Sequence, residues 1–148
     1  MLDSSLINKN YPAVVFHVTK HQIKSFSEAT GQTDPLYFNE NISKKKGRPS
    51  LLAPLTFLTV IDHKQKKPYQ YIIDLGMDLG RILHAGQKYK YHHPIYSGDV
   101  ITKRGKISNI YEKNNGDLQF VEFKSYYTNQ RDIMVAESLA IIAYRNNI

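Results

Sequence analysis

The 148-residue chain has the length of a single domain with a sizeable core. Eleven Tyr, six Phe and a hydrophobic fraction of 41% exclude a disordered chain. The absence of cysteine excludes disulfides, thiolate catalysis and cysteine metal sites. No apolar run approaches the roughly 20 residues that span a bilayer, and residues 1–10 lack the basic start and apolar stretch of a secretory signal. We therefore expect a cytoplasmic protein with no membrane partner.

Basic residues outnumber acidic ones by 20 to 13, which gives a net charge of +7. Such a charge favours anionic partners, including nucleic acid, phosphorylated cofactors and acidic carrier proteins. The densest basic cluster consists of Lys44, Lys45, Lys46 and Arg48. A groove that binds single-stranded nucleic acid has aromatic side chains between its basic residues, and this cluster has none. We therefore do not expect a nucleic-acid partner.

The first part of the chain predicts an arm, a strand and a helix. Residues 1–12 carry no periodicity and predict a flexible N-terminal arm ahead of a single domain at 13–148. The β-branched run at 14–18 predicts a short strand. Thr19 is a good N-cap for a helix over 20–30, because its hydroxyl can accept a hydrogen bond from an otherwise unpaired helix amide.

The middle of the chain begins with a turn and then becomes strongly apolar. Asp34 precedes Pro35 and is therefore kept out of the α region, which predicts a tight loop after the first helix. Residues 39–49 predict a short helix and a loop. Residues 51–61 are apolar on nearly every side, which predicts a buried central helix with Pro54 in its first turn.

From residue 69 onward the pattern changes to that of strands. Residues 69–75 are compatible with a strand or a loop, and the alternation of aromatic and polar residues over 82–95 predicts a half-buried strand. Three further strands are expected at 100–111, 120–127 and 133–144, the first two joined by an Asn-Asn-Gly hairpin. This order predicts an α+β fold, in which an antiparallel sheet wraps around a long central apolar helix.

Few residues indicate a cofactor or metal site. The glycines lack the spacing of a phosphate-binding loop, and none of the six histidines has the spacing of a zinc motif. His92 and His93 are consecutive on a predicted strand, so their side chains should point to opposite faces. We therefore expect no cofactor and no metal.

Three separated segments resemble the MaoC-like hydratases and dehydratases. They are Phe26 to Tyr37 (FSEATGQTDPLY), Leu52 to Leu58 (LAPLTFL), and Leu83 to Asp99 (LHAGQKYKYHHPIYSGD). The last segment is similar to the N-terminal dehydratase-half subgroup in particular. The resemblance covers about residues 13–145 and implies a hotdog fold, with 3-hydroxyacyl and enoyl thioesters of coenzyme A or acyl carrier protein as substrates.

The resemblance also locates the positions of a catalytic dyad. In the active family members the motif Gly-Asp-x-Asn-Pro-Leu/His-His supplies an Asp and, five positions later, a His. Gln32 and Tyr37 occupy these two positions here, and Asp34 replaces the Asn. Gln32 cannot ionise, and a tyrosine with an ordinary pKa of about 10 is a poor base at neutral pH. No catalytic residue is therefore expected at the usual positions, and Asp34 is the one candidate substitute.

The resemblance also implies a set of substrate-binding residues. It places the substrate near six residues, namely Asp34, Pro35, Tyr37, Leu55, Thr56 and His84. The amides near Leu55 and Thr56 would polarise a thioester carbonyl, unless they are simply capped or solvated. The basic cluster at 44–48 would meet coenzyme A phosphates or an acidic carrier protein, unless it is only a solvated loop.

Three functional hypotheses follow from the resemblance. The first is a subunit of a (3R)-3-hydroxyacyl-thioester dehydratase of fatty acid metabolism, which lacks the dyad and shapes the acyl-binding cleft for a catalytic second hotdog. The second is a non-catalytic, regulatory hotdog homodimer that binds acyl thioesters. The third is an active homodimeric hydratase with a displaced dyad, in which Asp34 acts with Tyr37 or His84.

Overall fold

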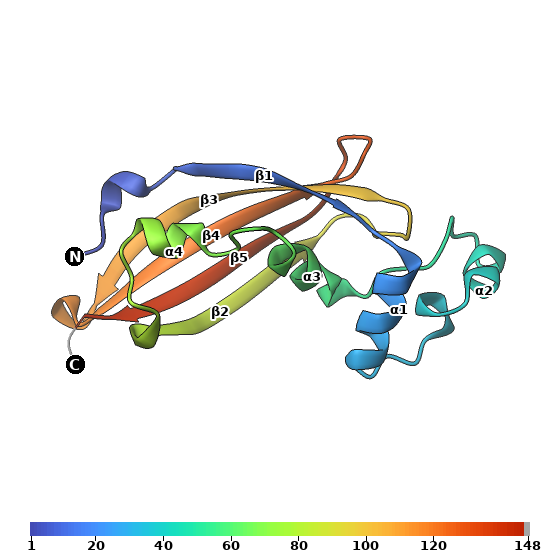
Figure 1. Ribbon diagram of the computed structural model, residues 1–148, viewed down its shortest axis with the longest axis horizontal. Helices are drawn as coiled ribbons and strands as arrows, with labels where there is room; N and C mark the ends of the chain where they lie inside the picture. Colours follow the sequence, from blue (N-terminus) through green and yellow to red (C-terminus); the bar gives the residue numbers. More distant parts are fainter. Residues whose placement is uncertain (147–148) are drawn as a thin grey trace.

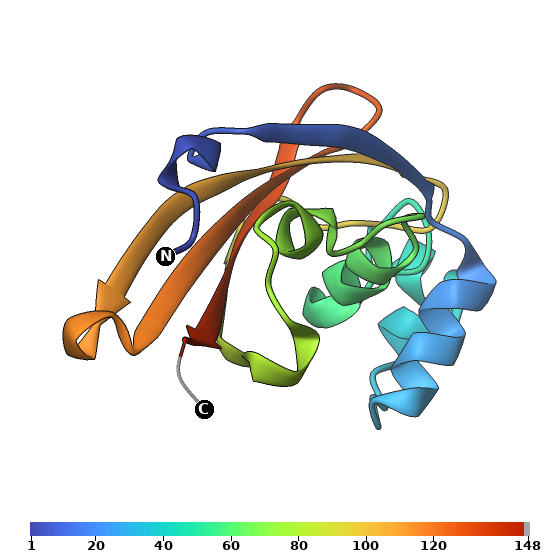
Figure 2. The ribbon, with the colours of Figure 1, turned by 60° about the vertical axis from the view of Figure 1, so that its left-hand side comes forward.

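A five-stranded antiparallel sheet in the order β1-β3-β4-β5-β2 curves around short helices on its inner face (Figures 1 and 2). The computed structural model describes residues 1–146. The strands are β1 (Asn10–His17), β2 (Ile82–Tyr91), β3 (Val100–Lys113), β4 (Leu118–Thr128) and β5 (Met134–Arg145). The α-helices are α1 (Lys20–Ala29), α2 (Glu40–Lys45), α3 (Leu58–His63) and α4 (Gln70–Asp74). The predicted α+β class and antiparallel sheet are confirmed.

Short 3-10 turns connect these elements. They are η1 (Ser4–Leu6), η2 (Pro35–Tyr37), η3 (Leu55–Phe57), η4 (Leu79–Arg81) and η5 (Asn114–Gly116). The predicted hairpin lies at η5, where Asn114 and Asn115 both have φ of 53° and Gly116 has φ of 90°. Asparagine and glycine tolerate this left-handed backbone better than other residues, so the Asn-Asn-Gly sequence fits the turn between β3 and β4.

The N-terminal residues lie against the sheet. Where the sequence favoured a flexible arm, Leu2, Leu6 and Ile7 pack against the core cluster at one end of the sheet. The amide of Asn8 donates to the carbonyl oxygen of Ile107 at 2.8 Å, and β1 begins at Asn10. Three apolar residues without a regular period were too weak a pattern to predict this packing.

Helix α1 forms as predicted. The Thr19 hydroxyl accepts from the amide of Gln22 at 3.2 Å, and the Gln22 side chain accepts from the amide of Thr19 at 3.0 Å. This reciprocal capping box satisfies two amides that the helix itself leaves unpaired. Ile23 is fully buried and joins the helix to the core.

The long central helix predicted at 51–61 is wrong in its extent. Leu52 pairs with Tyr96 as an isolated β-bridge, and helical structure begins only at η3 and continues through α3 to His63. A polar stretch at 64–69 follows, and α4 then forms where a strand or loop was expected. The apolar run ends at Ile61, and the polar residues after it cannot continue a buried helix.

The buried core consists of two clusters, one around α3 and one around α4. Phe57, Leu58 and Ile61 pack on one half of the sheet, and Tyr71 and Ile72 of α4 pack on the other. Figure 2 shows both green helices inside the curve of the sheet. Within residues 1–146, no helix has the length and apolar character needed to cross a membrane.

Candidate functional site

Two cavities lie one after the other along strands β2 and β5, on the helix side of the sheet. The smaller has a volume of about 270 Å³ and is lined by η2, η3 and the end of β2, with Tyr37, Leu55 and Tyr91 among its walls. The larger has a volume of about 500 Å³ and lies against α3, α4 and strands β2, β4 and β5. We call them the small cavity and the large cavity.

Tyr37 reaches the small cavity because a short turn carries it there. The Asp34 carboxylate accepts a hydrogen bond from the amide of Leu36 at 2.9 Å and caps η2, and Pro35 occupies the first position of the turn. Tyr37 is half-buried and packs against the core around Phe57. The Asp34 carboxylate is exposed and already serves as a cap.

The six predicted binding residues do not form one cluster. Tyr37 and Leu55 line the small cavity, whereas His84 lines the large cavity. Gln32, which follows α1, is exposed and lines neither of these cavities. Asp34 and Thr56 are also exposed and line neither cavity. Among the described residues, no side chain caps the start of η3, where Leu55 and Thr56 lie.

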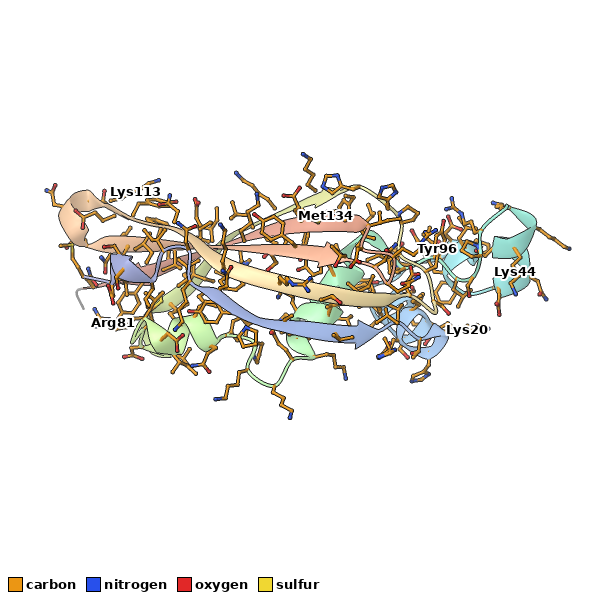
Figure 3. All side chains as sticks on the ribbon, turned by 90° about the horizontal axis from the view of Figure 1, so that it is seen from above. Lys20, Lys44, Arg81, Tyr96, Lys113 and Met134 are labelled. Atoms are coloured by element: carbon orange, nitrogen blue, oxygen red, sulfur yellow. The ribbon has the colours of Figure 1, made fainter. Side chains whose placement is uncertain are left out.

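A basic side chain also lines the small cavity. Arg48 donates from Nη1 to the Tyr96 hydroxyl at 3.2 Å, and its buried Nε has no partner within residues 1–146. The nearby helix α2 carries Lys44, which pairs with Glu40 at 3.0 Å. Hydrogen bonds from Lys20 and Lys44 lower the pKa of Glu40 to about 2. Figure 3 shows Lys20, Lys44 and Tyr96 together at one end of the molecule.

The expectation that His92 and His93 point to opposite faces is wrong. Strand β2 ends at Tyr91, so the two histidines follow the strand, and both line the small cavity. His92 Nε2 lies 2.9 Å from Glu137 Oε2. Hydrogen bonds from His92 and then from Lys124 lower the pKa of Glu137.

The large cavity contains an ion pair that the sequence did not reveal. Lys103 Nζ lies 2.7 Å from Asp62 Oδ1, and the two side chains are only 8% and 21% exposed. The Tyr127 hydroxyl donates to the same Asp62 oxygen at 2.6 Å and lies 3.1 Å from Ser138 Oγ. We call Asp62, Lys103, Tyr127 and Ser138 the polar cluster. One signal in the sequence was Lys103 itself, which shares the inward face of β3 with Ile101 and Ile107.

Two tyrosines separate the cavities. The rings of Tyr89 and Tyr91 stack with centroids 5.9 Å apart and planes at 23°. Tyr89 lines the large cavity and Tyr91 the small one. Burial, followed by the charge of Asp62, raises the pKa of Tyr89 to about 12.

A curved antiparallel sheet that wraps helices on its inner face, with cavities between the two, defines a hotdog protein. A family model described as "FAS1-like, dehydratase domain region" matches residues 5–138. The chain therefore belongs to this family of MaoC-like hotdog proteins, which confirms the resemblance seen in the sequence.

Individual proteins agree with this assignment. A UPF0336 protein of Streptomyces coelicolor is 32% identical over 118 residues, which is 79% of each chain. A chain of the HadBC (3R-hydroxyacyl-ACP dehydratase) complex from Mycobacterium tuberculosis is 27% identical, with a TM-score of 0.73 and coverage of 90% of this chain and 92% of that one. A chain of the ChsH1-ChsH2 complex of the same organism has the same fold, with a TM-score of 0.78, 18% identity, and coverage of 95% and 86%.

Proposed function

We propose that this chain is the non-catalytic hotdog subunit of a (3R)-3-hydroxyacyl-thioester dehydratase. It holds the acyl group, and a second hotdog subunit supplies the catalytic Asp and His. The observation that carries the proposal is the large cavity of about 500 Å³ in a chain whose dyad positions hold Gln32 and Tyr37. Neither residue is the Asp or the His of the active motif, so in this proposal the chain holds the acyl group and the second subunit supplies the acid and the base.

The volume of the large cavity suits an acyl group. Small-molecule sites have volumes of about 300–1,000 Å³ and are mostly apolar. Ile72, Ile82 and Ile142 supply apolar wall at the α4 end of this cavity. A chain bound there would bury its methylenes, each of which contributes about 0.8 kcal/mol.

In this proposal the thioester lies in the small cavity. Tyr37 forms part of its wall, and the amides of Leu55 and Thr56 polarise the thioester carbonyl. Asp34 and Pro35 hold the turn that positions Tyr37, and His84 contacts the acyl group farther along. The basic residues at 44–48 face the phosphates of coenzyme A or the acidic surface of a carrier protein, to which they are attracted by charge.

The exposed edge of the sheet at β2 is an argument for a second hotdog subunit. Strand β2 pairs with β5 on one side only, and its Leu83 is 69% exposed. Tyr91 is also exposed on this strand, at the wall of the small cavity. Exposed edge strands are prone to pair with another chain. The heteromeric HadBC and ChsH1-ChsH2 complexes among the structural relatives are consistent with such a partner.

Reconstitution tests the proposal. The purified chain is assayed for hydration of crotonyl-coenzyme A, alone and mixed with a hotdog subunit from the same source that has the intact motif. We expect acyl thioester binding without turnover alone, and turnover in the mixture. Binding without turnover in any mixture would favour the regulatory homodimer instead. Turnover by the chain alone that is lost in Asp34→Ala would establish a displaced dyad and overturn the proposal.

A further inference from the structure

The polar cluster is out of place in a cavity for a plain alkyl chain. Removing a Lys and an Asp from water costs several kcal/mol per ion, and a buried pair is often no more stable than apolar residues of similar size. Lys103 is 8% exposed at its side chain, and both it and Asp62 line the large cavity. Stability alone therefore does not account for charged groups at this position, whereas recognition of a polar group does.

The cluster has hydrogen-bonding capacity left over. Lys103 forms an ion pair with Oδ1 of Asp62, and the Tyr127 hydroxyl donates a hydrogen bond to the same oxygen. Within residues 1–146, Oδ2 of Asp62 accepts no hydrogen bond, and the Lys103 ammonium contacts no acceptor besides Asp62. An ammonium has three donors and a carboxylate about four acceptor positions. The cluster therefore offers the cavity both a donor and an acceptor, while its charges cancel.

This combination selects one kind of ligand group. A hydroxyl accepts from Lys103 and donates to Asp62, so it satisfies both sides at once. A carboxylate or an ammonium on the ligand would add an uncompensated charge in a poorly solvated site. A plain methylene would leave the remaining donor positions of Lys103 and the remaining acceptor positions of Asp62 without a ligand partner. A neutral group that both donates and accepts is thus favoured.

The position of the cluster along the cavity locates that group within the ligand. Ser138 of the cluster pairs with Tyr89 in the sheet. Tyr89 lines the large cavity, whereas Tyr37 lines the small cavity together with Tyr91. Beyond the cluster, toward α4, the walls become apolar at Ile82 and Ile142. A hydroxyl at the cluster would therefore lie inside the acyl chain, past the reacting carbons and before an apolar tail.

We propose that the large cavity recognises acyl groups that carry a hydroxyl within the chain, bound at the remaining hydrogen-bonding positions of Lys103 and Asp62. This inference rests on the proposed function, because it assumes that the thioester lies in the small cavity. It names a substrate class, mid-chain hydroxyacyl thioesters, that the family assignment does not supply.

Binding calorimetry with a matched ligand set tests the proposal. The ligands are dodecanoyl-coenzyme A and its 3-, 7- and 12-hydroxy derivatives. Hydrogen bonds to charged groups are among the stronger ones, so we expect the 7-hydroxy ligand to bind at least about tenfold more tightly than the unsubstituted chain. Equal affinity, or a preference confined to the 3-hydroxy ligand, would overturn the proposal.

Two variants separate recognition from structure. The double variant Asp62→Asn with Lys103→Met keeps the volume and removes both charges, which proteins often tolerate. It should bind dodecanoyl-coenzyme A at least as tightly as the native chain does, because the charged pair no longer disfavours a plain chain, and it should lose the tenfold preference. Arg104→Met is the matched control, because Arg104 is the next residue on β3, on the opposite face, and should keep the preference. A double variant that loses only thermal stability and retains the preference would assign the cluster a structural role and refute the inference.

The inference and the proposed function fail in different ways. If the native chain binds all four ligands equally, the inference is wrong and the acyl-binding function remains. If it binds none of them, alone or with a catalytic subunit, the proposed function itself is wrong.

Discussion

Tyr89 and Tyr91 stack two residues apart on β2 and separate two cavities that otherwise follow the same pair of strands. Strands β2 and β5 run beneath both cavities, with Tyr91 opposite Ala136 and Tyr89 opposite Ser138. The tyrosine pair thus lies between the small cavity, where we propose the thioester binds, and the large cavity, where we propose the acyl chain binds. An acyl chain that uses both cavities must pass these rings.

Removal of one ring should change the preference for chain length. In Tyr91→Ala the cavities join, so longer chains bury more methylenes, each adding up to about 0.8 kcal/mol, or roughly fourfold in affinity. Calorimetry with butanoyl- to tetradecanoyl-coenzyme A measures this dependence. Tyr126→Ala is the control, because Tyr126 contacts Lys124 and lines neither of the two cavities. An unchanged dependence on chain length in Tyr91→Ala would contradict the separating role.

Gly105 lies against Phe123, one of the residues that line the large cavity. A Cβ built at this position would clash with Cε1 of Phe123, whose ring stacks on Tyr71 and lines the large cavity. Gly105→Ala should therefore displace the ring, lower the free energy of unfolding by about 1–3 kcal/mol and weaken acyl binding. Urea unfolding and calorimetry check the two effects. Native-like values in both would show that the ring has room to move.

Removing only one partner of the ion pair between Lys103 and Asp62 should lower the free energy of unfolding more than removing both. Lys103→Met leaves a poorly solvated carboxylate without its cation, which should cost about 3 kcal/mol. The double variant with Asp62→Asn removes both charges and should be considerably more stable than the single one. Urea unfolding of the single and double variants completes the comparison. A double variant as unstable as Lys103→Met would show that packing, rather than charge, dominates at this position.

Stability should fall at alkaline pH because of Tyr127. Burial, followed by the carboxylate of Asp62, raises the pKa of this hydroxyl above its ordinary value. A group with a raised folded-state pKa adds stability below its unfolded pKa of about 10 and loses it as the pH rises toward the folded value. We expect a loss of about 1.4 kcal/mol per pH unit above pH 10 from this one group.

Urea unfolding from about pH 9 to 11 measures that loss. In Tyr127→Phe the titrating group is absent, so the free energy of unfolding should fall less steeply with pH. Burial also raises the pKa of Tyr11, Tyr71, Tyr89 and Tyr91, so these groups still titrate in the variant and account for the slope that remains. Equal slopes in the native chain and the variant would contradict the assignment.

Local patterns in the sequence predicted much of the fold. Thr19 marked the start of α1, and the Asn-Asn-Gly turn and the alternating strands marked the β3–β4 hairpin. Helix α4 was missed because its five residues are too few to show a helical period. The single long helix was wrong because an apolar run alone does not indicate where the helix begins, and the bridge between Leu52 and Tyr96 keeps its first residues extended.

The candidate site was less predictable than the fold. The family motif placed Tyr37 and Leu55 in one cavity, but His84 lies in the other. Asp62 and Lys103 are far apart in the sequence and meet only when α3 packs against β3. No local pattern contains that contact, so the polar cluster required the three-dimensional structure.

The most direct test of the account is the rate of crotonyl-coenzyme A hydration by the reconstituted pair, with substitutions in each subunit. The account predicts that replacing the catalytic Asp of the second subunit abolishes turnover. It also predicts that Tyr37→Phe in this chain leaves kcat within a few-fold of the native value. Loss of turnover in Tyr37→Phe, with acyl thioester binding intact, would make Tyr37 a catalytic residue and contradict the account.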